Sequence, residues 1–159
     1  MSKKILVPVD FSELSDELVD YALEYARLWQ AKILLVYVIQ STQLVEILGT
    51  VETGIPVLTD SALIEQIKEG ALSRLKEYQE RIQAQGIEAE NYILTGIPYL
   101  EITQFAGEQE VDLIIIASHS RSGWRQFLLG SVTAKVAQKS PVPVLIYKPK
   151  RKEKEPEKS

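Results

Sequence analysis

The chain has no cysteine and one histidine among its 159 residues, and these shortages exclude several kinds of chemistry. Without cysteine there is no disulfide framework, no thiolate nucleophile and no thiolate metal ligand. A single histidine without a His/Cys cluster argues against a structural zinc site. We therefore expect no metal-binding residues, and no constellation of catalytic side chains is evident.

Long hydrophobic runs are also missing. The longest, residues 33–39, is far shorter than the roughly 20 apolar residues needed to cross a bilayer. The N-terminal segment MSKKILVPVD has two lysines but too short an apolar run for a secretory signal. These features predict a cytoplasmic protein that has no membrane partner.

Two common phosphate-binding motifs are absent as well. No glycine lies between the first predicted strand and its helix, which excludes the dinucleotide fingerprint. No G-x4-G-K-[ST] motif occurs, which excludes a P-loop NTPase. The net charge is −4, and basic residues gather at the C-terminus, so the body is acidic. An acidic body argues against a nucleic-acid partner, because such binding neutralises many phosphates.

Apolar strands and amphipathic helices alternate along the sequence. Strands are predicted at residues 5–9, 33–38, 92–94, 113–117 and 144–147. Helices are predicted after Ser12 or Ser15, from Asp60 to Gly86, from Pro98, and from Ser131 to Lys139. This alternation predicts an α/β, Rossmann-like fold: a doubly wound five-stranded parallel sheet with helices on both faces. Polar residues lead into the third strand, which we therefore place near an edge.

We expect a single domain over residues 1–148, followed by a charged tail at 149–159. The tail has no apolar side chains and is expected to be disordered, as a solvated end or a weak electrostatic contact site. Residues 40–60 show no clear period. Two interpretations of this segment stay open, a surface loop and a flap over a binding site.

The pair Gly130-Ser131 opens a predicted helix shortly after a buried strand. The first N–H groups of a helix are free, and the helix dipole favours negative charge there, so this is a place to hold phosphate. Gly130 would let a phosphate approach the backbone, and the hydroxyls of Ser131 and Thr133 could add hydrogen bonds. Helix capping by Ser131 is the alternative explanation.

In open α/β sheets, ligands bind beyond the carboxyl ends of the strands where the winding reverses. If the first and fourth strands are neighbours there, Asp10 faces the loop 118–130 across the crevice. Asp10 could contact a ribose or a phosphate-bound metal, or it could cap the following helix. His119 could be a general base or make a local hydrogen bond, and Arg121 could reach phosphate or remain solvated.

Five segments carry a resemblance to a known family. They are KKILVPVDFSE at 3–13, LLVYVI at 34–39, TGIPYLEI at 95–102, VDLIIIASHSRSG at 111–123 and LLGSVTAKVAQKSPVPVLIYK at 128–148. In these segments the chain resembles the universal stress protein family over nearly all of residues 3–148. The resemblance implies an adenine nucleotide alpha-hydrolase-like fold and a homodimer paired through strand five, from Val142 to Tyr147. It also implies a regulatory role in the stress response.

The nucleotide-binding branch of that family carries the motif G-x2-G-x9-G-[ST]. Its last two positions fall on Gly130 and Ser131, whereas its first two glycines are replaced by Ala117 and Ser120. The motif is thus degenerate, and the substitutions favour a nucleotide with fewer phosphates, AMP over ATP. Asp10 resembles the residue near the ribose, and Val38 the residue whose backbone meets adenine.

The expected function is that of a regulatory dimer that binds an adenine nucleotide, ATP or AMP. Whether Mg²⁺ binds together with the nucleotide is left open. The alternatives are a nucleotide-free protein-interaction dimer and a slow ATPase, and the regulatory protein partner is unknown. The predicted nucleotide-binding residues are Pro8, Val9, Asp10, Val38, Ala117, Ser118, His119, Ser120, Arg121, Gly130, Ser131, Val132 and Thr133.

Overall fold

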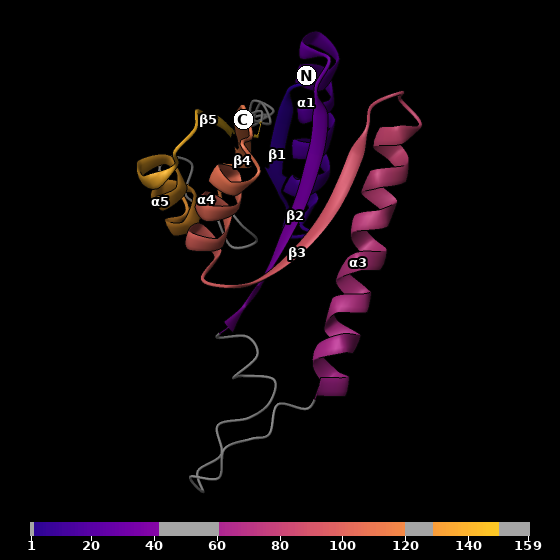
Figure 1. Cartoon of the computed structure of the whole chain (residues 1–159), viewed down its shortest axis with the longest axis vertical. Coiled ribbons are helices and arrows are strands. Elements are labelled where there is room, and N and C mark those ends of the chain that lie inside the picture. Colours follow the sequence, from indigo (N-terminus) through magenta and orange to yellow (C-terminus); the bar gives the residue numbers. More distant parts are fainter. Residues whose placement is uncertain (1, 42–60, 120–128, 150–159) are drawn as a thin grey trace, which may run out of the picture.

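The structure is a computed structural model that describes residues 2–41, 61–119 and 129–149. Strands and helices alternate through these residues, as the sequence predicts (Figure 1). The strands are β1 (Lys4–Pro8), β2 (Lys32–Gln40), β3 (Ala89–Gly96), β4 (Leu113–Ala117) and β5 (Val144–Tyr147). The helices are α1 (Glu13–Trp29), α3 (Ser61–Gln83), α4 (Pro98–Glu108) and α5 (Ser131–Lys139).

The five strands form one parallel sheet in the order β3-β2-β1-β4-β5. From β1 the chain winds outward through β2 to β3, and it then returns to build β4 and β5 on the other side. The winding therefore reverses between β1 and β4, so the condition that placed Asp10 across from the loop 118–130 is met. The predicted doubly wound parallel fold is confirmed, and so is the edge position of β3.

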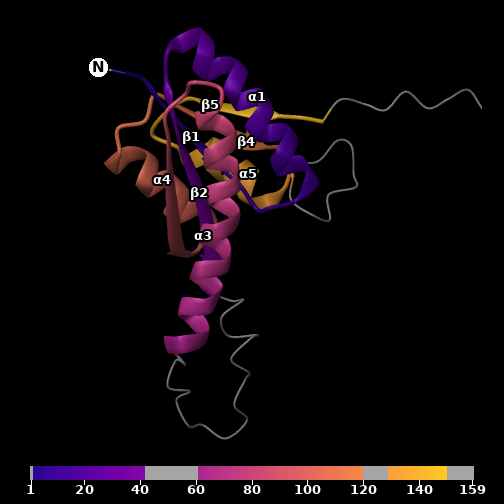
Figure 2. The same cartoon turned by 90° about the vertical axis from the view of Figure 1, so that its right-hand side faces the viewer.

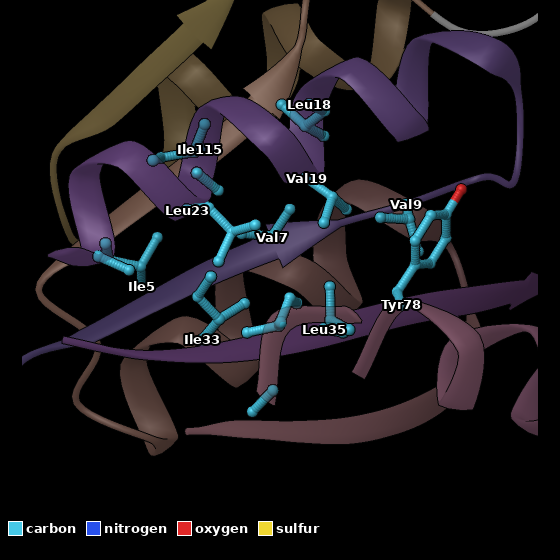
Figure 3. Close-up of a cluster of buried hydrophobic side chains, with 14 of the residues drawn as sticks. Ile5, Val7, Val9, Leu18, Val19, Leu23, Ile33, Leu35, Tyr78 and Ile115 are labelled. Atoms are coloured by element: carbon cyan, nitrogen blue, oxygen red, sulfur yellow. The ribbon is translucent and has the colours of Figure 1, made fainter. Parts of the chain in front are cut away.

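Each face of the sheet carries its own hydrophobic core. Helices α1 and α3 cover one face, where the buried side chains of Figure 3 lie, and α4 and α5 cover the other. Successive residues of β1 alternate between the two, with Ile5 and Val7 in the first core and Leu6 in the second. Because both faces are covered, the central strands are apolar at nearly every position.

Helix α3 projects beyond the sheet (Figure 2), and its later turns make the core contacts. The apolar residues of this helix recur at helical spacing, and of these Ala71, Leu75, Tyr78 and Ile82 are buried, whereas Ile64 and Ile67 are only half-buried. The helix ends at Gln83, and Gly86 takes a φ of +80° in the turn that follows. None of the described helices is long and apolar enough to cross a bilayer.

Two sequence predictions fall on residues outside the described part of the chain. They are the loop or flap predicted at 40–60, of which only Gln40, the last residue of β2, and Ser41 are described, with the helix start at Asp60, and the disordered tail predicted at 149–159, of which only Pro149 is described. Both stay predictions.

The predicted third strand, 92–94, was too short, because β3 begins at Ala89. Glu90 and Asn91, the polar residues before Tyr92 within the strand, each have a side-chain partner, although the buried Asn91 Oδ1 atom accepts no hydrogen bond among the described residues. The Lys32 ammonium lies 2.6 Å from Glu90 Oε1, and Asn91 Nδ2 donates to Gln79 Oε1 at 2.9 Å. These partners compensate for placing polar side chains on a strand.

The Lys32–Glu90 pair makes stability depend on acid pH. Hydrogen bonds from Lys32 and Tyr92 hold the pKa of Glu90 below its usual value. The stabilisation is therefore complete above the unfolded-state pKa of about 4.3 and is lost as pH falls through the lower folded-state value. Lys32→Met removes the main cause, so the loss of unfolding free energy between neutral and acid pH should shrink. We expect a reduction of roughly 0.5 kcal/mol, since the pair is partly exposed.

Urea unfolding at neutral pH and near pH 3 measures this difference. Lys76→Met is the matched control. The Lys76 ammonium is well exposed and lies 3.9 Å from Glu80 Oε1, so its ion pair is weaker than that of Lys32 with Glu90. An acid dependence that changes equally in both variants would contradict a specific effect of Lys32.

Candidate functional site

A cavity of about 280 Å³ opens at the carboxyl ends of β1, β2 and β4, where the winding reverses. The first residues of α5 close one side, and Pro98 and Ile102 of α4 contribute another. Its volume is near the lower end of the roughly 300–1,000 Å³ typical of small-molecule sites. The cavity is therefore of a size for one small ligand.

The cavity gathers most of the predicted site residues from four separate stretches of the chain. Those that line it are Pro8, Val9, Asp10, Val38, Ala117, His119, Gly130, Ser131, Val132 and Thr133. Ser118 is buried behind the wall and does not line it. Ser120 and Arg121 lie outside the described residues, so their roles stay predictions.

Sequence reasoning missed several other lining residues: Ser15, Val36, Tyr37, Gln40, Pro98, Ile102 and Ile116. Most of them lie in the carboxyl-terminal halves of strands or near the starts of the helices that follow. The carboxyl-end rule could have found them, because it applies to every strand that borders the reversal. The start of α4 could have been found from Pro98, which is separated from the end of β3 by Ile97 alone.

Gly130 is required for a close backbone approach rather than for an unusual backbone conformation. Its φ is −57°, which any residue can adopt. A Cβ atom at this position would lie 3.3 Å from His119 Cα and 3.5 Å from the Ser118 carbonyl oxygen. The Gly130 N–H donates to that same oxygen at 2.8 Å. Glycine thus lets the start of α5 lie against the chain that leaves β4.

A second contact fixes α5 to β4 at this point. The buried Thr133 hydroxyl donates to the Ala117 carbonyl oxygen at 2.7 Å, so its only proton is used within the protein. The oxygen can still accept a hydrogen bond, but this hydroxyl is not the phosphate donor that the sequence suggested. Ser131, in contrast, is exposed at the cavity.

The N-terminal end of α5 lies at the cavity. Among the described residues no side-chain cap is found at this end, and the first intrahelical bond runs from the Ala134 N–H to the Gly130 carbonyl oxygen at 2.9 Å. The N–H groups of Ser131, Val132 and Thr133 therefore have no intrahelical acceptor. Together with the helix dipole, they form a site suited to an anionic group.

Asp10 closes the turn that leads into α1 and also lies on the cavity wall; its contact with a ribose or a phosphate-bound metal stays a prediction. Its Oδ1 atom accepts hydrogen bonds from the Ser12 N–H at 3.0 Å and the Ser15 hydroxyl at 2.8 Å. The Asp10 N–H donates to the same Ser15 oxygen at 3.0 Å. These bonds close the turn into α1 while Asp10 also lines the cavity. The turn holds a carboxylate at the rim in a defined orientation.

The one histidine is held by its neighbour. Ser118 Oγ lies 3.0 Å from His119 Nδ1, and the Ser118 N–H donates to the Tyr147 carbonyl oxygen at 2.8 Å. Among the described residues no carboxylate contacts His119, so they contain no Ser-His-Asp arrangement around it. The same residues contain no group of three or more histidine or acidic side chains that could hold a metal ion.

Comparison with known proteins agrees with this architecture. The model of the universal stress protein family matches residues 1–148. Universal stress protein MJ0577 of Methanocaldococcus jannaschii is 31% identical over 157 residues, with 94% of this chain and 97% of that protein covered.

Two solved structures extend the comparison. The MJ0577 structure superimposes with a TM-score of 0.80 at 30% identity, covering 96% of this chain and 99% of that one. The Archaeoglobus fulgidus universal stress protein, solved in complex with dAMP, has a TM-score of 0.62 at 26% identity, with 91% and 96% covered. On its sequence and its fold together, this chain belongs to the universal stress protein family.

Proposed function

We propose that this protein is a cytoplasmic stress-response regulator that binds an adenine nucleotide in the cavity at the reversal of the sheet and acts as a homodimer. The observation that carries the proposal is the start of α5, whose first residues line this cavity and whose first N–H groups have no intrahelical acceptor. The dAMP bound by the Archaeoglobus fulgidus relative supports an adenine nucleotide as the ligand.

Each part of a nucleotide has a chemically suitable partner among the lining residues. The phosphate would accept hydrogen bonds from the N–H groups of α5, and the ribose would lie near the Asp10 carboxylate. The adenine would pack against apolar side chains such as Ile102 and Ile116 and meet the backbone at Val38. Polar groups thus lie at one end of the ligand and apolar groups at the other, as in most small-molecule sites.

We propose AMP as the preferred nucleotide. Ala117, at the first glycine position of the family motif, lines the cavity, and its carbonyl oxygen accepts the hydrogen bond of Thr133 from the start of α5. A methyl group in place of the glycine hydrogen would leave less room at this end of β4 for further phosphates. The monophosphate in the Archaeoglobus fulgidus relative is consistent with this preference.

We propose binding rather than efficient hydrolysis. Phosphoryl transfer requires an oriented nucleophile and positioned charge around the transferred phosphate. Among the described lining residues, Asp10, Tyr37 and His119 are the only ones with titratable side chains. The Asp10 Oδ1 atom already accepts two hydrogen bonds that close the turn. The described part of the site is therefore better suited to holding a nucleotide than to activating water.

The proposed dimer interface is the free edge of β5. All four residues of this strand are only half-buried in the isolated chain, and β4 is its one neighbour in the sheet. The carbonyl oxygens of Pro143 and Tyr147 accept hydrogen bonds from β4. Because backbone groups alternate in direction along a strand, the N–H groups of Val144 and Ile146 point to the free edge. An apolar edge of this kind suits pairing with a second copy.

Replacing Ser131 tests the nucleotide site. Proline at the first helical position is well tolerated, and the ψ of 152° at Gly130 suits a residue before proline, yet Ser131→Pro removes one N–H donor. In calorimetric titration with AMP, ADP and ATP, each with and without Mg²⁺, we expect micromolar AMP binding by the parent. Ser131→Pro should weaken AMP binding by about tenfold or more, the value of one charge-assisted hydrogen bond.

Ser131→Ala is the matched control, because it removes the hydroxyl and keeps the N–H group. A parent protein that binds no nucleotide at millimolar concentration would refute the proposal and favour a nucleotide-free interaction dimer. If Ser131→Pro binds AMP as tightly as Ser131→Ala, the phosphate does not lie at the start of α5.

Replacing Ile146 tests the dimer. Ile146→Pro removes an edge-facing N–H group without removing a hydrogen bond to β4, since proline is tolerated where the N–H faces outward. We expect the dimer dissociation constant, measured by analytical ultracentrifugation, to rise by about tenfold or more. Ile146→Ala controls for the lost side chain and should remain closer to the parent. Equal dissociation constants for the two variants would argue against pairing through this edge.

A further inference from the structure

Phe11 occupies a backbone conformation that bulky residues rarely adopt. Its φ is +63°, in the left-handed region. Among the described residues other than glycine, Gln30 and Glu110 also have positive φ, but both follow the end of a helix, where such conformations are common. Phe11 instead lies between β1 and α1, directly after Asp10. A strained residue beside a binding cavity needs surroundings that hold it in place.

Arg74 of α3 makes two contacts that hold this turn. Its guanidinium carbon lies 4.5 Å from the centre of the Phe11 ring, and its Nη2 donates to the Phe11 carbonyl oxygen at 3.2 Å. The planar guanidinium can stack on a ring and donate a hydrogen bond at once, which a lysine ammonium does less well. One side chain thus restrains both the ring and the backbone of the strained residue.

Phe11 transmits this restraint to two residues of the cavity wall. Its ring centre lies 4.6 Å from that of Tyr37, which lines the cavity from β2. Its backbone joins Asp10 to Ser12, and the Ser12 N–H donates to Asp10 Oδ1 at 3.0 Å. Arg74 itself does not line the cavity. Arg74 nevertheless contacts Phe11, which follows Asp10 in the chain and packs against the Tyr37 ring.

We propose that Arg74 is a positioning residue for the nucleotide site: by holding Phe11 in its left-handed conformation, it keeps Asp10 and Tyr37 in place. Ligand affinity then depends on how α3 is seated against the turn. The inference rests on the proposed nucleotide function in one respect: AMP is the ligand chosen for the binding test.

Arg81 supplies a matched control on the same helix. Its guanidinium carbon lies 5.4 Å from the centre of the Tyr78 ring, and its Nη2 atom lies 3.3 Å from Asp20 Oδ1 and from the Asp16 carbonyl oxygen. The two oxygen contacts attach α3 to α1, whereas Tyr78 belongs to α3 itself. The Tyr78 ring centre lies 6.3 Å from that of Phe11, but no hydrogen bond or cation–ring contact joins Arg81 directly to Phe11. The pair of variants therefore separates direct restraint of the turn from general docking of α3.

The first test compares AMP affinity by calorimetry in Arg74→Met and Arg81→Met. We expect Arg74→Met to weaken binding by about tenfold, while Arg81→Met stays within about twofold of the parent. Glycine adopts positive φ without strain, so in a Phe11→Gly background Arg74→Met should weaken binding by less than about threefold. Equal weakening by the two arginine variants would overturn the proposal, and so would full additivity with Phe11→Gly.

The second test needs no ligand, and it decides the proposal even if the protein binds no nucleotide. Amide hydrogen exchange at Asp10 and Ser12 reports opening of the turn, because both N–H groups are hydrogen-bonded within it. Arg74→Met should accelerate exchange at these two amides by about tenfold and leave Ala22, inside α1, unchanged. Unchanged exchange at Asp10 and Ser12, or equal acceleration in Arg81→Met, would show that Arg74 does not position the turn.

Discussion

The parallel pairing of β1 with β4 is the constraint on which the rest of this molecule depends. Because the chain winds outward from this pair in opposite directions, the segments leaving the two strands diverge and a cavity opens between them. Asp10 follows β1 and Ala117 ends β4, and both line the cavity. Helix α5 starts beside the end of β4 and lines the same cavity. Residues distant in sequence are therefore brought together by the order of the strands, and the two apolar cores hold that order in place.

The polar groups around the cavity divide into those that hold the protein together and those left for a ligand. The Thr133 hydroxyl donates to the Ala117 carbonyl oxygen in β4, and the Gly130 N–H donates to that of Ser118, the residue after β4. These two hydrogen bonds fix the start of α5. The N–H groups of Ser131, Val132 and Thr133 have no intrahelical acceptor, and so they suit an anion without rearrangement of the helix. Such preorganisation lowers the entropic cost of binding. The preorganised N–H groups favour recognition of a phosphate. Hydrolysis would in addition require an oriented nucleophile and positioned charge, which these groups do not provide.

The strain at Phe11 adds a link between this site and the outer helix α3. A left-handed conformation costs a bulky residue roughly 1–2 kcal/mol, and the contacts with Arg74 and Tyr37 offset that cost. Strain of this size persists only where the surroundings determine the conformation. In a regulatory protein, a contact between the binding site and an outer helix provides a physical route by which ligand and surface can affect each other.

The sequence by itself determined the order of strands and helices, because apolar periodicity and the glycine and proline signals are local. It also determined most of the cavity wall, since the carboxyl-end rule singles out Asp10 and the loop ending at Gly130, and the family motif singles out Ala117 and Gly130. Only the tertiary structure decided how each polar atom is used. Ser118 lies behind the wall, Thr133 donates to β4, and Glu90 extends β3 through Lys32. Phe11 was missed because its conformation is set by Arg74, a residue 63 positions away. Hydrogen bonds and ring contacts between distant segments leave no periodic signal, so they become visible only when the chain is folded.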